Sequence, residues 1–166
     1  MTSPGSLKVA TPSDREIVMT RVFDAPRTLV WEALTTPALL KRWLLGPPGW
    51  TMTTCEMDLR VGGAYRYQWR KDDGTVMGMG GILREVVAPE RLTATERFDQ
   101  SWYPGEGLVS QVLTEADGQT TITMTLRYES KEARDMVVKS GASTGMEMGY
   151  ARLAELLAGT LADGRK

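Results

Sequence analysis

The sequence predicts an α+β domain in which a curved antiparallel sheet holds one long helix. Between residues 142 and 162, apolar side chains recur at steps of three and four, which places them on one helix face: Met146, Tyr150, Leu153, Leu157 and Leu161. Much of the preceding chain alternates apolar and polar side chains, as β-strands do. A long helix with one apolar face needs a large apolar surface to pack against, and a sheet provides it.

The first part of the chain is predicted to form one strand and two short helices. Residues 15–24 alternate well enough to form the strand. Asp24-Ala25-Pro26 then begins a helix that runs to about residue 35, because proline is favoured in a first helical turn. A second short helix begins after Thr36-Pro37 and is ended by Gly46-Pro47-Pro48-Gly49.

Six more strands and a short helix are predicted between this point and the long helix. The strands are residues 50–61, 64–70, 75–88, 91–98, 108–115 and 119–129. Asp72-Asp73-Gly74 and Ala116-Asp117-Gly118 are strong hairpin signals, so successive strands are expected to pair antiparallel. Gly78, Gly80 and Gly81 predict a sharp bend in the third of these strands. Ser130 is expected to cap a helix over residues 131–139.

Length and composition predict a single domain over residues 15–162, with a flexible leader at 1–14 and a tail at 163–166. The net charge of −1 gives no electrostatic case for binding nucleic acid. No apolar run is long enough to span a bilayer, and the N-terminus lacks the pattern of a signal peptide. We therefore expect a cytoplasmic protein without membrane insertion, either a monomer or a homodimer.

Histidine is absent, and Cys55 is the only cysteine. This composition excludes Ser-His-Asp and Cys-His catalysis within one chain, and it argues against a zinc site. The sequence accordingly predicts no catalytic residue, no metal site and no cofactor. Cys55 is expected to be a small buried hydrophobic side chain rather than a reactive thiol.

Several segments, taken in order, resemble the family of activators of heat-shock protein 90 ATPase homologues. That family belongs to the StAR-related lipid-transfer and Bet v 1-like superfamily of helix-grip folds. The resemblance covers about residues 8–158. It rests on Arg21-Val22-Phe23-Asp24-Ala25-Pro26-Arg27, Val30-Trp31-Glu32-Ala33, Arg42-Trp43 with Gly46-Pro47, Asp58-Leu59-Arg60-Val61-Gly62-Gly63, Glu85-Val86-Val87 with Pro89-Glu90-Arg91-Leu92, and Gly145-Met146 with Tyr150-Ala151-Arg152-Leu153.

The resemblance implies a helix-grip fold, with a seven-stranded antiparallel sheet around a long C-terminal helix and a cavity between them. Members of the superfamily bind lipids, steroids, polyketides and other apolar molecules. We therefore expect this protein to bind a small hydrophobic or aromatic ligand in that cavity. Aromatic rings offer broad contact surfaces and methionine adapts to irregular shapes. The predicted lining is Trp43, Tyr65, Tyr67, Trp69, Glu96, Trp102, Met124, Leu126, Met146, Tyr150 and Leu153.

Three alternatives stay open. The aromatic and methionine side chains could simply fill the core. The protein could instead be an enzyme of the cyclase or hydrolase type that uses a carboxylate, a tyrosine or an ordered water. It could also be an interaction protein, a chaperone cofactor or a stress-response partner. The eukaryotic namesakes carry a further N-terminal domain that contacts the chaperone, and here only the short leader stands in that place.

Carboxylates on the strands are the remaining chemical candidates. Glu96 shares a strand face with apolar Leu92, Ala94 and Phe98, so it is either a paired structural charge or a polar contact in the cavity. Arg21, on a similarly apolar face, is the hypothetical partner. Glu56 and Asp58 are expected on a solvated face, because the side chains that alternate with them make the better inner face: Cys55, Met57, Leu59 and Val61.

Overall fold

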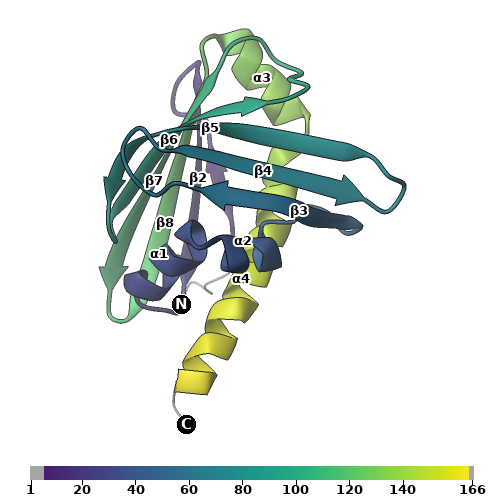
Figure 1. Ribbon diagram of the computed structural model, residues 1–166. Helices are drawn as coiled ribbons and strands as arrows, with labels where there is room; N and C mark the ends of the chain where they lie inside the picture. Colours follow the sequence, from purple (N-terminus) through teal and green to yellow (C-terminus); the bar gives the residue numbers. More distant parts are fainter. Residues whose placement is uncertain (1–5, 165–166) are drawn as a thin grey trace.

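The computed structural model describes residues 6–164 and confirms the α+β architecture (Figure 1). In this part of the chain, eight strands form one antiparallel sheet in the order β1-β2-β8-β7-β6-β5-β4-β3. The strands are β1 (Lys8–Ala10), β2 (Glu16–Phe23), β3 (Trp50–Met57), β4 (Ala64–Lys71), β5 (Val76–Val87), β6 (Arg91–Phe98), β7 (Gly107–Ala116) and β8 (Gln119–Arg127). The helices are α1 (Arg27–Thr35), α2 (Pro37–Trp43), α3 (Lys131–Lys139) and α4 (Ala142–Gly164).

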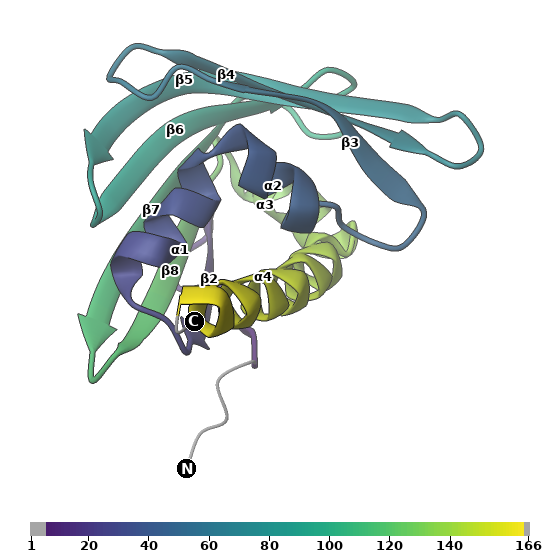
Figure 2. The same ribbon diagram turned by 60° about the horizontal axis from the view of Figure 1, so that its bottom comes forward.

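The sheet curves around α4, as Figure 2 shows from the side on which the C-terminal end of the helix comes forward. Strands β3 to β8 pair each with the next one in sequence, because each pair is a hairpin. Strand β2 returns to pair with β8, so the first long strand and the last lie side by side. None of the helices within residues 6–164 is both long and apolar enough to cross a membrane.

The seven predicted strands all form, and an eighth, β1, lies within the segment expected to be a flexible leader. Lys8, Val9 and Ala10 pair with β2 through the register Lys8↔Thr20 to Ala10↔Val18. All three residues are exposed. A strand at the edge of a sheet needs only backbone hydrogen bonds on one side, so no apolar alternation announces it in the sequence.

Strand β3 ends four residues earlier than predicted. It stops at Met57, so Leu59 and Val61 lie in the following turn and are 41% and 63% exposed. The expectation that both belong to the inner face was therefore wrong. Asp58 accepts a hydrogen bond from the Arg60 Nε–H (2.8 Å) within this turn, and Gly62 there has φ +86°. A turn with a residue at positive φ breaks the two-residue alternation on which the prediction depended.

The core between the sheet and α4 is built on Tyr150, which is fully buried. Its ring stacks on Trp43 of α2 with centroids 5.8 Å apart and meets Phe23 of β2 edge-on at 5.4 Å. Gly149 permits this arrangement, because a Cβ there would lie 3.3 Å from the Trp43 carbonyl oxygen. Helix α4 is thereby held closely against α2.

Two glycines, Gly81 in β5 and Gly159 in α4, predict opposite effects of the same substitution to alanine. At Gly81 a Cβ would lie 2.0 Å from the Thr95 backbone oxygen, so Gly81→Ala should lower the free energy of unfolding by about 1–3 kcal/mol. At Gly159 in α4 nothing lies within 4 Å, so Gly159→Ala should raise it by about 1 kcal/mol through helix propensity. Urea unfolding of both variants tests this. An unchanged free energy of unfolding in Gly81→Ala would show that β5 does not require glycine at this position.

Candidate functional site

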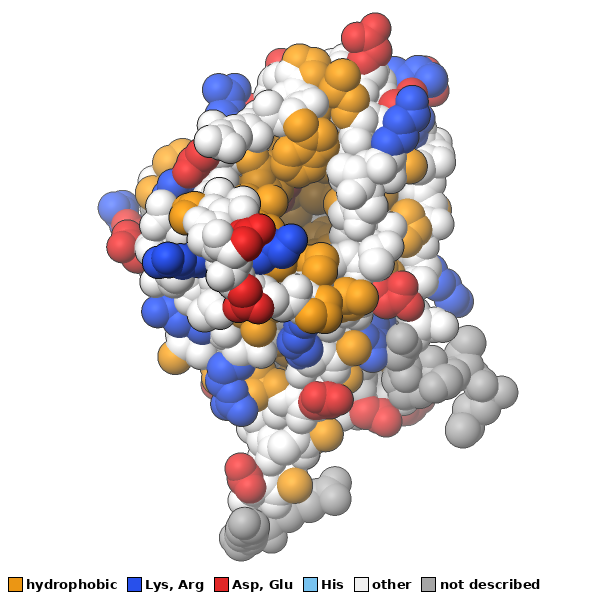
Figure 3. Space-filling model, turned by 90° about the vertical axis from the view of Figure 1, so that its right-hand side faces the viewer, with side chains coloured by type: hydrophobic (Ala, Val, Ile, Leu, Met, Phe, Trp, Pro, Cys, Tyr) orange, Lys and Arg blue, Asp and Glu red, His pale blue; other side chains and the backbone are white. Residues whose placement is uncertain are grey.

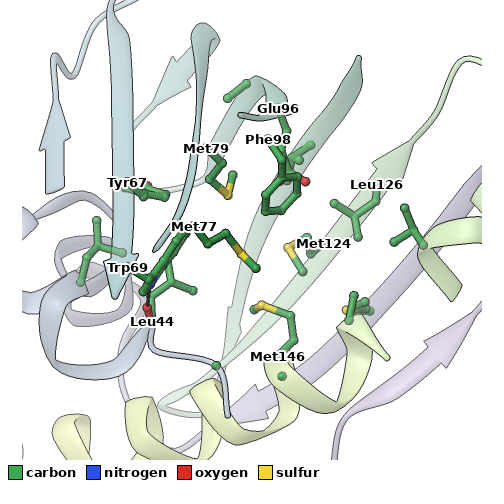
Figure 4. A pocket seen from close by; sticks show the side chains of 18 of the residues that line it. Leu44, Tyr67, Trp69, Met77, Met79, Glu96, Phe98, Met124, Leu126 and Met146 are labelled. Atoms are coloured by element: carbon green, nitrogen blue, oxygen red, sulfur yellow. Dashed lines mark hydrogen bonds between the residues drawn. The ribbon is translucent and has the colours of Figure 1, made fainter. Parts of the chain in front are cut away.

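A cavity of about 610 Å³ lies between the concave face of the sheet and the N-terminal half of α4. Figure 3 shows a hollow in the molecular surface that is floored by hydrophobic side chains. Met77 and Trp102 line the cavity and yet are 40% and 39% exposed, so they lie where it opens to solvent. Figure 4 shows how side chains from the strands and from α4 enter the same space.

One wall of the cavity is the aromatic face of β4. Tyr65, Tyr67 and Trp69 alternate along the strand, and neighbouring ring centroids lie 5.1 and 5.9 Å apart. The Tyr65 hydroxyl donates to the Thr95 carbonyl oxygen (2.6 Å), and the Trp69 Nε1–H donates to the Leu44 carbonyl oxygen (2.7 Å). The polar ends of these two rings are thus already paired, and their apolar faces are left for contact.

A second aromatic cluster lines the other side. Phe98 at the end of β6 contacts Trp102 with ring centroids 4.7 Å apart, Trp102 meets Tyr103 at 5.2 Å, and Tyr103 meets Tyr128 at 5.3 Å. The sequence reasoning did not include Phe98, Tyr103 or Tyr128 in the predicted lining. Two of them could have been found by extending the alternation by one step, from Glu96 to Phe98 and from Leu126 to Tyr128.

Methionines make up much of the remaining wall. Those that line the cavity are Met19, Met57, Met77, Met79, Met124 and Met146. The thioether side chain is flexible and polarisable, so a wall of methionines adapts to ligands of different outline. Met77 and Met79 were also missed from the sequence, although they alternate with Gly78 and Gly80 in β5.

Glu96 is the only Asp, Glu, Lys or Arg among the described residues that line the cavity. Burial raises the pKa of its carboxyl group from the ordinary 4.5 to about 7. Within residues 6–164 the carboxylate forms neither a hydrogen bond nor an ion pair. The structure therefore contradicts the interpretation of Glu96 as a paired structural charge.

Four tyrosines from three parts of the chain interact electrostatically with this carboxylate. Burial raises the pKa of each phenol, and the negative charge of Glu96 raises it further: Tyr65, Tyr67, Tyr103 and Tyr128. The Tyr103 hydroxyl is buried and has no hydrogen-bond partner within the described chain. The polar groups of the cavity are therefore few, and the Glu96 carboxyl group and the Tyr103 hydroxyl are the two that remain available to a ligand.

Arg21 does not pair with Glu96, so that hypothesis was wrong. The guanidinium of Arg21 lies over the Phe23 ring, 4.8 Å from its centroid. Burial lowers the pKa of Arg21, and its electrostatic partners are Tyr150 and Glu147. Strands β8 and β7 separate β2 from β6. The registers also set the two residues at different heights in the sheet, because Arg21 is level with Leu113 of β7 whereas Glu96 is level with Gly107.

The remaining chemical candidates are inert or absent from the described chain. Cys55 is half-buried, and burial raises the pKa of its thiol to about 11, so the thiol is protonated at neutral pH. Within residues 6–164, no group of three or more His, Cys, Asp or Glu side chains is placed to hold a metal ion.

Nine of the eleven predicted lining residues do line the cavity. They are Trp43, Tyr65, Tyr67, Trp69, Glu96, Trp102, Met124, Leu126 and Met146. Tyr150 and Leu153 do not, because they are fully buried in the core farther along α4. Whether the nine contact a ligand stays a prediction.

The sequence profile of the family described as "Activator of Hsp90 ATPase homolog 1-like protein" matches residues 24–158. The chain belongs to this family. Its helix-grip fold, in which a curved sheet and a long C-terminal helix enclose a cavity, is the arrangement described above. No curated protein matches the chain.

Solved structures of related bacterial proteins share the fold. A protein from Rhodobacter sphaeroides is 35% identical, with 92% of this chain and 98% of that chain covered and a TM-score of 0.87. A protein from Mycobacterium smegmatis is 26% identical, with 92% and 97% covered and a TM-score of 0.81. A protein from Chromobacterium violaceum is 27% identical, with 87% and 98% covered and a TM-score of 0.77.

The raised pKa of Glu96 predicts how stability depends on pH. Between about pH 4.5 and pH 7 the folded protein retains a proton that the unfolded chain loses, so stability should fall as the pH rises through this range. The loss amounts to at most about 3 kcal/mol. Glu96→Gln should remove it, while Glu56→Gln on the exposed face of β3 should keep it. Urea unfolding across this range checks the slopes, and equal slopes for wild type and Glu96→Gln would contradict the assignment.

Proposed function

We propose that this protein binds a small hydrophobic or aromatic molecule in the cavity between the sheet and α4. The observation that carries the proposal is the cavity itself, whose volume of about 610 Å³ falls within the usual range for small-molecule sites. Its walls are mostly aromatic, aliphatic and methionine side chains, with a few polar groups gathered around Glu96. This combination suits an apolar molecule that carries one polar group.

The cavity is not explained by loose packing of the whole core. Val30, Ile122, Tyr150 and Leu153 are each 0% exposed and belong to one cluster of buried residues, so a continuous core forms besides the cavity. Protein interiors rarely leave voids much larger than a water molecule, because each void forfeits contacts. A space of this size beside a well-packed core is therefore better understood as a binding site.

The same observation bears on the interaction-protein alternative. That alternative predicts a filled core together with an exposed apolar patch. The space between the sheet and the N-terminal half of α4 is not filled by side chains, and its apolar lining faces inward. Ligand binding accounts for this arrangement more directly than a chaperone contact does.

Glu96 favours a second candidate function, acid–base chemistry on the bound molecule. A carboxyl group with a pKa near 7 both donates and accepts protons at neutral pH, which is what a general acid or base requires. Its position inside the cavity would bring it against a ligand. The test is mass analysis of molecules extracted before and after incubation with wild type or Glu96→Gln. A product formed by wild type alone would support catalysis, and identical extracts would count against it.

Ligand binding predicts that the neutral fluorescent probe N-phenyl-1-naphthylamine binds one site per chain. Met146→Trp should weaken binding by about tenfold or more, because the larger side chain occupies cavity volume. Met148→Trp is the matched control, since Met148 lies on the same helix, is 38% exposed and does not line the cavity. Fluorescence titration measures both affinities.

Either of two results would contradict the proposal: no probe binding to the wild type, or equal loss of affinity in the two variants. Native mass spectrometry of the purified protein gives an independent check. A small molecule retained at one per chain would support the cavity as its site and would reveal its chemical class.

A further inference from the structure

The lining of the cavity is mostly apolar, but it carries one charged side chain. Its described lining contains no Lys, Arg or Asp, and Glu96 supplies the single negative charge. The other polar side chains that line it, apart from the tyrosines and tryptophans, are Gln111 and Ser140. Ser140 already donates its hydroxyl hydrogen to the Val137 carbonyl oxygen (2.6 Å). Among the described lining side chains, the only formal charge that a ligand meets is therefore the negative charge of Glu96.

The acceptor capacity of Glu96 is unfilled. A carboxylate offers about four lone-pair positions for hydrogen bonds. No donor from residues 6–164 occupies any of them, and the Tyr65 hydroxyl donates its hydrogen to the Thr95 carbonyl oxygen instead. A buried polar group without partners is costly, so a ligand that brings a donor relieves that cost.

Aromatic rings surround the same carboxylate. Phe98 and Tyr103 belong to the second aromatic cluster, and the charge of Glu96 acts on Tyr67, Tyr103 and Tyr128. The faces of aromatic rings attract cations, and the attraction grows when water is excluded. In Figure 4, Glu96 and Phe98 enter the cavity from the sheet, opposite Met146 of α4.

Three kinds of apolar ligand can be compared on these terms. A molecule with a carboxylate end, such as a fatty acid, would place like charges together and find no cationic partner. An alcohol or phenol would supply one neutral donor to Glu96. A protonated amine would supply a hydrogen bond together with a full positive charge opposite the carboxylate, and its cation would also contact the aromatic faces.

We propose that the cavity is selective for hydrophobic amines, with the ammonium group held by Glu96 among the aromatic rings of Phe98, Tyr103 and Tyr128. The apolar body of the ligand then lies along the methionines of β5, β8 and α4. This inference rests on the proposed ligand binding and adds the chemical class of the ligand.

Three probes that differ only in their polar end test the proposal: 1-naphthylmethylamine, 1-naphthylmethanol and 1-naphthoate. Displacement of N-phenyl-1-naphthylamine at neutral pH gives their affinities for the full chain. The amine should bind about tenfold or more tighter than the alcohol, and the naphthoate should bind weakest. This ranking is measured on the wild-type protein, so it does not depend on how any variant folds.

Two variants of equal charge then assign the selectivity to one residue. Glu96→Gln keeps the shape of the side chain and should reduce the preference for the amine over the alcohol to within about twofold. Glu56→Gln removes an exposed carboxylate that does not line the cavity, and it should leave the preference unchanged.

The outcomes separate this inference from the function beneath it. If the amine and the alcohol bind wild type equally, or if the preference survives in Glu96→Gln, amine selectivity is overturned while ligand binding stands. If N-phenyl-1-naphthylamine and all three naphthalene probes fail to bind, both the selectivity and the proposed ligand binding are overturned.

Discussion

The backbone of α4 stands off the sheet, and the rest of the structure depends on how that gap is bridged. The closest backbone neighbours of α4 are the helices α1, α2 and α3 rather than any strand. Farther along α4, large side chains span the distance, with Tyr150 packed between Trp43 and Phe23. Near its N-terminus, Gly145 and Met146 leave the distance unfilled, and the cavity occupies it. One helix at one spacing thus produces both a dense core and a binding space.

This spacing explains which parts of the site could be predicted from the sequence. Alternation placed the β4 aromatics and the β8 residues Met124 and Leu126 on the inner face, because a strand has only two faces. The apolar stripe of α4 was found as readily, but periodicity does not distinguish a stripe that packs against side chains from one that borders a void. Met146 therefore lines the cavity as predicted, whereas Tyr150, one turn later, belongs to the packed core.

The wrong prediction of a partner for Glu96 shows a second limit of what can be inferred from the sequence. A carboxylate on an apolar strand face needs a partner, and the sequence suggested Arg21 as that partner. The pairing depended on strand order, and nothing local in the sequence fixes how many strands separate two positions. Strand β1 was not predicted for a related reason, because a three-residue edge strand forms through hydrogen bonds to the backbone of its neighbour. Both errors arise from long-range pairing rather than from local preference.

An unpaired carboxylate in an apolar cavity links stability to binding through one free energy. Above neutral pH the protein must hold this negative charge in an apolar cavity with no counter-ion from residues 6–164, and its stability is lowered accordingly. A cation bound beside Glu96 would restore the missing interaction and would be bound more tightly by a comparable amount. A hydrophobic substitute for Glu96 would make the core more stable, but it would remove this contribution to affinity. The destabilisation of the empty cavity and its selectivity for an amine thus have the same physical origin.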